Sequence, residues 1–363
     1  SDSNWLQALA YFIVPETQAA PPATPPEAAS CAYTAADLAD DALDVKITQE
    51  IQDLAASLNY SPARIFEYVS NSIRFEPYYG ALKGAGGTLY GKAGGATDQP
   101  SLLIALLRAA NIPARYVQGV VDVNESTSLG ANGRAARWVG AKNSQGAAAV
   151  LSQGQNPTVI TFTGDLGVRM AHVWVEACVP YVNYRGSAAD NSGHRWLPLD
   201  PSFKDKSYQT GISTAVSFDY TSFLATRSNT LPHEFLETQV NTAIKALDPN
   251  NTLNDVPYTG TINPVKFDVL PATLPYEVNA FTNWSNSGTP ETSILPDTHR
   301  YHFTITVNGG DIASVLRFPE IIHERLTLSF KGATAPDQAT LDAWITDGDP
   351  DSTIPCGITV VPS

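Results

Sequence analysis

The stretch GGATDQPSLLIALLR, residues 94–108, decides the fold of this chain. Its four leucines, at positions 102, 103, 106 and 107, recur at helical spacing and predict a helix over about residues 98–110. Residues 112–121, IPARYVQGVV, then alternate in the manner of a strand. A helix this rich in leucine belongs in a core, and Ala96 stands directly before it.

Two later segments, AHVWVE at residues 171–176 and WLPLDP at residues 196–201, follow in a fixed order. Together with the leucine-rich helix they resemble the histidine strand, the aspartate strand and the nucleophile helix of transglutaminase-like domains, whose core is papain-like. The resemblance implies a Cys/His/Asp triad that performs acyl transfer or amide hydrolysis through a thioester, without a cofactor. It assigns His172 and Asp200 to two members of the triad, and it leaves Ala96 in the place of the cysteine.

These residue types suit that chemistry. Unpaired N–H groups and the dipole at a helix N-terminus lower the pKa of a thiol, so position 96 suits a nucleophile. A histidine then accepts the proton and an acid holds the imidazole in its productive tautomer, roles that fit His172 and Asp200. Because strand side chains alternate, His172, Trp174 and Glu176 share a face that we expect to line a cleft, whereas the valine face is core. With Thr97, Trp174 and Glu176 are the candidate binding residues.

Other residues fit the role of nucleophile poorly. The Thr97 hydroxyl would need an N-terminal amine or a strong base, and a helix cap explains this residue better. Cys178 lies six residues beyond His172 on the same strand, about 20 Å along it, too far to attack beside that imidazole. Glu176 and Asp98 suggest a carboxylate pair, yet Asp98 is better explained as complementing the helix dipole.

The order of elements predicts an α+β protein, with the nucleophile helix packed on an antiparallel sheet. We expect a helix over residues 35–58 and a second helix that begins at Ser61 and Pro62. A glycine-rich loop is expected over residues 80–95, and a surface helix at about residues 138–151 within an insertion. Alternating segments near residues 275–276, 301–307 and 325–330 predict strands.

Three regions follow from this pattern. Residues 1–34 are an N-terminal arm with a proline-rich linker, because proline removes hydrogen-bond donors and fixes φ. Residues 35–225 are the transglutaminase-like domain, and residues 226–363 are a mostly β domain that we expect to be cut before a further module. Residues 4–14 carry enough apolar side chains to need a partner surface, which predicts self-assembly or docking through this arm.

The resemblance extends from about residue 60 to the end of the chain. Motifs such as FEYV at residues 66–69, VPY at 179–181 and LPY at 274–276 look like the transglutaminase-like modules of large bacterial surface proteins associated with RHS/YD repeats. In that subgroup the nucleophile position is not reliably cysteine. The resemblance therefore implies a secreted or surface protein, located outside the cell, on its surface or in the periplasm.

Composition narrows the possible partners. The chain has 363 residues with 22 basic and 36 acidic side chains, and its net charge of -14 argues against nucleic acid and anionic membranes. No apolar run approaches the roughly 20 residues of a membrane span. Cys31, Cys178 and Cys356 are too few and too scattered for a metal site. Cys31 and Cys356 could form a disulfide if the termini meet, although free thiols are the favoured interpretation.

Two function classes remain open. The first is an inactive transglutaminase-like module that binds a peptide, a glycan or a protein partner in its cleft. The second is an active cysteine acyltransferase or peptidase whose nucleophile was replaced by alanine at position 96. The proline-rich arm and the subgroup resemblance favour the first, and the natural codon at position 96 would separate the two.

Overall fold

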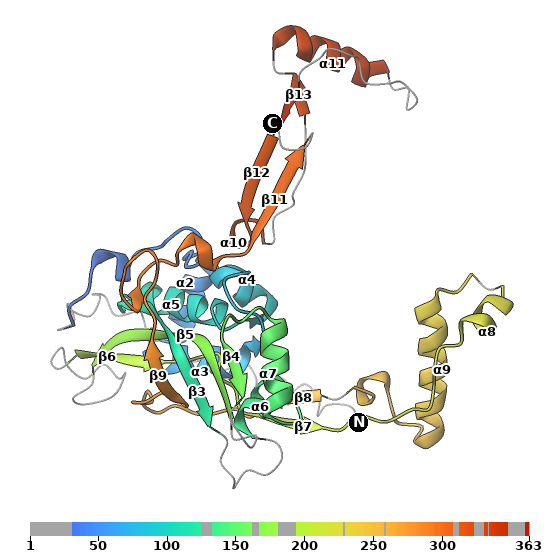
Figure 1. Ribbon diagram of the computed structural model, residues 1–363, viewed down its shortest axis with the longest axis horizontal. Helices are drawn as coiled ribbons and strands as arrows, with labels where there is room; N and C mark the ends of the chain where they lie inside the picture. The colour runs from blue at the N-terminus through green and yellow to red at the C-terminus, as the bar shows by residue number, and fades with distance from the viewer. Residues whose placement is uncertain are drawn as a thin grey trace, which may run out of the picture. The chain divides into compact units, whose positions relative to one another are not determined.

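A computed structural model describes residues 31–124, 133–161, 167–180, 194–227, 229–257, 259–307, 312–322, 330–332, 334–347 and 360–362. These residues belong to two compact units, residues 1–319 and residues 320–363 (Figure 1). The smaller unit contains the antiparallel pair β13 (Phe330–Gly332) and β14 (Val360–Pro362), and the helix α11 (Ala335–Asp347). The larger unit holds the candidate site. No helix within the described ranges is long and apolar enough to cross a membrane.

Helices α2 (Gln49–Ser57), α3 (Pro62–Ser72), α4 (Gly84–Gly91) and α5 (Asp98–Ala109) form one layer of the larger unit. Helix α5 lies where the leucines predict it, and every side chain from Asp98 to Arg108 is buried. Ser61 caps α3 by accepting a hydrogen bond from the Arg64 backbone N–H, with Pro62 in the first turn as expected. The core of the chain is therefore built around α5.

Two helix predictions in this layer are wrong. The helix expected over residues 35–58 is reduced to α2 and a short 3-10 turn, η1 (Ala35–Asp37). The loop expected over residues 80–95 contains α4, although glycine is a poor helix former. A side chain from elsewhere in the sequence stabilises the first turn of α4, and this contact is described with the site below.

The six-stranded sheet of the larger unit is antiparallel, as expected for the α+β class. Its centre is the pair β3 (Ala114–Asn124) and β5 (Gly167–Pro180), in which Gly119 lies opposite His172. Strands β4 (Val159–Thr161) and β6 (His194–Leu199) pair with β5. Strands β9 (Glu277–Phe281) and β10 (Glu291–Thr292) pair with β3. Segments more than 150 residues apart in sequence thus share one sheet.

Both faces of β5 are buried. The valine face packs against α5 as predicted, and Val173, Val175, Ala177 and Val179 belong to that core. The opposite face, expected to line a cleft, instead packs against a second core that includes Trp138 and Trp174. Helices α6 (Arg134–Val139) and α7 (Ser144–Gln153) contribute to it. The prediction of one surface helix over residues 138–151 is therefore wrong, because these two helices cover an apolar face of the sheet.

A separate mostly β domain beginning at residue 226 is not clearly shown. The chain after the sheet forms α8 (Tyr220–Ala225) and α9 (Pro232–Leu247), and β9 and β10 return to the core sheet. Two further antiparallel pairs are β7 (Lys206–Gln209) with β8 (Thr259–Ile262) and β11 (His302–Val307) with β12 (Ile312–Arg317). Of the strand expected at residues 325–330, only residue 330 falls among the described residues.

Cys31 and Cys178 form a disulfide, with Cα atoms 6.2 Å apart and a sequence separation of 147 residues. The expectation that these cysteines are free thiols is wrong, because the segment that begins at Cys31 lies beside β5, the strand that carries Cys178. Cys356 and the arm at residues 4–14 lie outside the described residues. Cys31 has another partner, so a bridge from it to Cys356 is excluded.

Candidate active site

His172 and Asp200 form a buried hydrogen-bonded pair. His172 lies in the middle of β5, and Asp200 directly follows β6, which is paired with β5. The His172 Nε2 and Asp200 Oδ2 atoms are 2.9 Å apart, and the two side chains are 1% and 0% exposed. Strand pairing therefore brings together the histidine and the aspartate that the sequence motifs single out.

Asp200 accepts hydrogen bonds at both carboxylate oxygens. Oδ1 accepts from the Ser202 backbone N–H at 2.8 Å and from Ser202 Oγ at 2.7 Å, while Oδ2 accepts from His172 and from Tyr276 Oη at 3.0 Å. Burial raises the pKa of Asp200, but the His172 and Ser202 contacts outweigh it and the pKa is lowered. An ionised carboxylate only accepts, so His172 Nε2 is the donor in this hydrogen bond.

Aromatic side chains enclose the pair. The Trp138 and Tyr276 rings meet the His172 ring edge to face, with centroids 5.7 Å and 5.3 Å away. Trp138 Nε1 donates to the Ser202 carbonyl at 2.8 Å, so the same tryptophan fixes the loop that holds Asp200. Sequence analysis missed Trp138 because it lies in the alanine-rich insertion, where nothing local indicates a contact with β5.

Lys204 anchors the loop after Asp200 from the other side. Its Nζ donates to the carbonyls of Val69 and Ser70 at 2.8 Å each, and to that of Pro201. The two former carbonyls belong to the last turns of α3, where unpaired carbonyls favour a cation. Burial lowers the pKa of Lys204, and nearby Asp200 opposes this. All three ammonium hydrogens have acceptors, which ties the Asp200 loop to the helical layer.

Ala96 lies just before α5 and is 5% exposed. It belongs to the same buried cluster as Trp138, Trp174 and Tyr276, the first and last of which contact His172. Ala96 and the His172–Asp200 pair therefore adjoin one cluster of buried aromatic side chains, the aromatic enclosure. As whole residues, Ala96, His172 and Asp200 are 5%, 1% and 5% exposed, so the enclosure is closed to solvent at these three residues.

Thr97 does not cap α5 with its side chain, contrary to expectation. Its Oγ1 lies 3.2 Å from His299 Nε2, and the residue is fully buried. Burial lowers the pKa of His299 to about 4, with a smaller contribution from Arg300, so His299 is neutral near pH 7. Sequence analysis missed His299, because about 200 residues separate it from the helix that it contacts.

Asp98 also differs from its expected role. Its carboxylate accepts hydrogen bonds from the backbone N–H groups of Leu82, Lys83 and Gly84, and from the Tyr78 hydroxyl. These backbone groups lie at the start of α4, so Asp98 caps α4 although it belongs to the first turn of α5. Burial raises the pKa of Asp98 despite these donors. The Asp98 side chain, two residues after Ala96, therefore joins two helices.

Trp174 and Glu176 make internal contacts. Trp174 is 1% exposed and packs near Phe281 of β9, with ring centroids 5.9 Å apart. Glu176 forms an ion pair of 2.7 Å with Arg115, whose guanidinium lies 4.1 Å above the Trp196 ring. Their expected binding role, like that of Thr97, stays a prediction. In the part of the chain that the structure describes, no group of three or more His, Cys, Asp or Glu side chains is placed to hold a metal ion.

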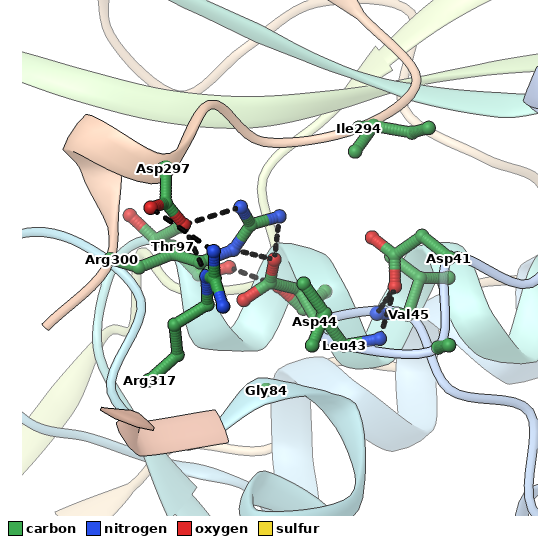
Figure 2. A network of polar contacts seen from close by, with 12 residues as sticks. Asp41, Leu43, Asp44, Val45, Gly84, Thr97, Ile294, Asp297, Arg300 and Arg317 are labelled. Atoms are coloured by element: carbon green, nitrogen blue, oxygen red, sulfur yellow. Dashed lines mark hydrogen bonds and ion pairs between the residues drawn. The ribbon is translucent and has the colours of Figure 1, made fainter. Parts of the chain in front are cut away.

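A polar network fixes the segment that carries His299. Figure 2 shows Arg300 between Asp44 and Asp297, and Arg317 bound to the same Asp297. Arg300 Nε and Nη2 each lie 2.7 Å from Asp44 Oδ2. Backbone hydrogen bonds from Ala81 to His299 and from Tyr301 to Ala81 hold the same segment in place. The network therefore secures His299 against the start of α5.

The pH dependence of stability should expose the role of Asp44. Burial raises its pKa to about 7, with Asp41 and Asp98 adding to the effect and Arg300 opposing it. The folded protein then keeps a proton that the unfolded chain releases, so the free energy of unfolding falls as pH rises from about 4 to about 7. Asp44→Asn should flatten this slope, as measured by urea denaturation across that range.

Asp297→Asn is the matched control, because the other carboxylate on Arg300 shifts in the opposite direction. Hydrogen bonds from Arg317 lower the pKa of Asp297 to about 2. The contribution of Asp297 to the free energy of unfolding is therefore lost only as pH falls below about 4. Asp297→Asn should leave the slope between pH 4 and pH 7 in place. An Asp44→Asn protein with the original slope would rule out Asp44 as its source.

Comparison with known proteins gives one match. Residues 45–201 match the family model of the transglutaminase-like superfamily. The matched range contains position 96, His172 and Asp200, whereas Tyr276, His299 and Arg300 lie after it. Neither a search of curated proteins nor a search of solved structures found a significant match.

Proposed function

With a transglutaminase-like superfamily domain at residues 45–201 as the premise, we propose that this chain is an inactive module of that superfamily. We assign it a role in binding or assembly. The observation that carries the proposal is Ala96, which stands before α5 in the same enclosure as the His172–Asp200 pair. A methyl group cannot form a thioester, so the acyl-transfer chemistry of such a site stops at this residue.

Neither Thr97 nor Cys178 replaces the missing thiol. The Thr97 hydroxyl is fully buried, and its neighbour His299 is a weak base because burial lowers its pKa to about 4, while the Cys178 sulfur is bonded to Cys31. The enclosure offers a partner little surface to contact, because Ala96 and His172 are only 5% and 1% exposed. A peptide, glycan or protein partner would therefore engage surfaces outside the enclosure, and residues 4–14 remain part of the proposal as a segment for self-assembly.

We place the module outside the cytoplasm, at the cell surface or in the periplasm. The Cys31–Cys178 disulfide supports this location, because structural disulfides persist in oxidising compartments. The motif resemblance to RHS/YD-associated bacterial surface proteins supports the same location. Detection of the mature protein in the secreted or surface fraction of its host would test this part.

Ala96→Cys tests the assignment of the site. The new sulfur would sit at a helix N-terminus in the enclosure of His172, so its pKa should be depressed and iodoacetamide should react faster near neutral pH. We expect a rate about tenfold above that of the Ala96→Cys/His172→Ala double variant, which keeps the thiol and loses the imidazole. Ultraviolet absorbance of the thiolate against pH gives the same comparison without depending on reagent access.

The outcomes separate the two function classes. A reactive thiol without turnover of glutamine peptides or other peptides supports an inactive module that retains the frame of a catalytic site. Amine incorporation or peptide cleavage by Ala96→Cys, or a cysteine codon at position 96 in the natural gene, would replace the proposal with an active acyltransferase or peptidase. A thiol as slow as in the double variant would show that the pair is only structural.

A further inference from the structure

Tyr276 reaches the site from a part of the chain that follows the matched domain. Its hydroxyl donates to Asp200 Oδ2 at 3.0 Å, and its ring stands edge to face with His172 at 5.3 Å. We propose that Tyr276 is a positioning residue that acts on His172 through Asp200. The proposal rests on the proposed function only in treating His172 and Asp200 as the remaining members of a catalytic site.

The two oxygens of Asp200 have different surroundings. Oδ1 is satisfied by the backbone and side chain of Ser202 alone, whereas Oδ2 is shared between His172 and Tyr276. A shared oxygen divides its negative charge between two donors, so the strength of the bond to His172 depends on the phenol. This sharing distinguishes Tyr276 from a tyrosine that only fills space.

The surroundings keep Tyr276 a donor. Its side chain is buried, and burial together with the charge of Asp200 raises its pKa well above the usual range. The phenol therefore stays protonated throughout the range in which the protein is studied. It can bond to an acceptor-only carboxylate in one direction, with the hydroxyl donating.

The sheet determines where Tyr276 stands. Strand β9 begins at the next residue, and Glu277 and Val278 pair with Asp122 and Val121 of β3. The Asn279 side chain donates to Asp122, and the Thr282 backbone N–H donates to the Gln118 carbonyl at 3.2 Å. Because β3 also pairs with the strand of His172, the register of β9 fixes Tyr276 relative to that histidine.

The consequence is that residues 45–201 supply one of the four hydrogen-bond donors to Asp200, namely His172. Two more come from Ser202, directly after the matched range, and the fourth is the Tyr276 hydroxyl, far beyond it. The return of the chain into the sheet at β9 supplies this fourth donor. The segment after the domain is thus part of the site, and the chain between Asp200 and β9 is a connection within one functional unit.

Tyr276→Phe tests the proposal in the alanine-bearing chain, without any need for activity. Phenylalanine keeps the ring against His172 and removes the competing donor, so Asp200 Oδ2 becomes a better acceptor for His172. The proton NMR resonance of His172 Nε2–H, assigned by its loss in His172→Gln, should move downfield. Tyr116→Phe is the matched control, because that buried hydroxyl donates to Ser101 Oγ on the other face of the sheet.

A second variant reverses the sign and protects the test against misfolding of Tyr276→Phe. Incorporation of 3-fluorotyrosine at position 276 keeps the hydroxyl and makes it a stronger donor, so the His172 Nε2–H resonance should move upfield. Opposite shifts in the two variants, with none in Tyr116→Phe, support the proposal. A resonance unmoved at both substitutions, or moved equally by Tyr116→Phe, overturns it. The Ala96→Cys alkylation result is independent, so either idea can fail alone.

Discussion

Replacing Cys31 and Cys178 by alanine is expected to lower the free energy of unfolding by about 3 to 5 kcal/mol. The bridge closes a loop of 147 residues, and a cross-link over a long loop removes much conformational freedom from the unfolded chain. It also secures the segment after Cys31, in which the Ala39 carbonyl accepts from Arg108 and Asp37 accepts from Ser293. Urea denaturation of the oxidised protein and of the double variant measures the difference.

Cys356→Ala provides the control, since this cysteine has no part in the bridge between Cys31 and Cys178. It removes a cysteine and leaves the bridge in place, so a loss of stability that appears only in the double variant is due to the bridge. Mass spectrometry after proteolysis without reduction should recover the peptides of Cys31 and Cys178 joined. Equal stability of the oxidised protein and the double variant would contradict the expectation.

Asp98→Ala, made in the otherwise unchanged chain, is expected to lower the free energy of unfolding by about 3 to 5 kcal/mol. This is the usual cost of breaking a buried charged contact by removing one partner. The change leaves the Tyr78 hydroxyl and the backbone N–H groups of Leu82, Lys83 and Gly84 without their acceptor. Loss of helix α4 should accompany it, which hydrogen exchange at residues 84–91 would detect. Asp98→Asn should cost less, because its amide oxygen keeps part of the acceptor capacity.

Asp53→Ala is the comparison for Asp98→Ala, because Asp53 is an exposed acid on α2 whose carboxylate accepts a hydrogen bond from Gln49. Its replacement should change stability by no more than about 0.5 kcal/mol. If Asp98→Ala proved as mild as Asp53→Ala, Asp98 would be no more than a charge at a helix end.

The sequence predicted those features that depend on neighbours along the chain. The leucines of α5, the Ser61 cap and the alternation in β5 each determine local structure within about ten residues. The motif resemblance then indicated His172 and Asp200, which the sheet brings into contact. Local periodicity predicts a helix or strand reliably when the apolar face of that element is the face that the fold buries.

The features that sequence analysis missed depend on contacts between distant segments. Helix α4 is capped by Asp98, and the Gly84 N–H donates to that carboxylate at 2.9 Å from 14 residues away. Tyr276 lies 76 residues beyond Asp200, His299 lies 202 residues beyond Thr97, and Cys31 precedes its disulfide partner Cys178 by 147 residues. No pattern within a window of one helix or strand carries such information, because register and chain return decide these contacts.

The burial of Ala96 among apolar side chains bears on how a protein of this architecture tolerates mutation. A methyl group fills that place in the aromatic enclosure, so exchange of a thiol for alanine there removes chemistry with little effect on the folded state. Loss of Asp200 would instead leave buried hydrogen-bonding groups of Ser202 and Tyr276 without this acceptor, and loss of His172 would remove one donor from the buried Asp200 carboxylate. On the proposed assignment, position 96 is therefore the member of the triad that selection can relax at the least cost to foldedness, whereas His172 and Asp200 are also held by the contacts of the folded structure.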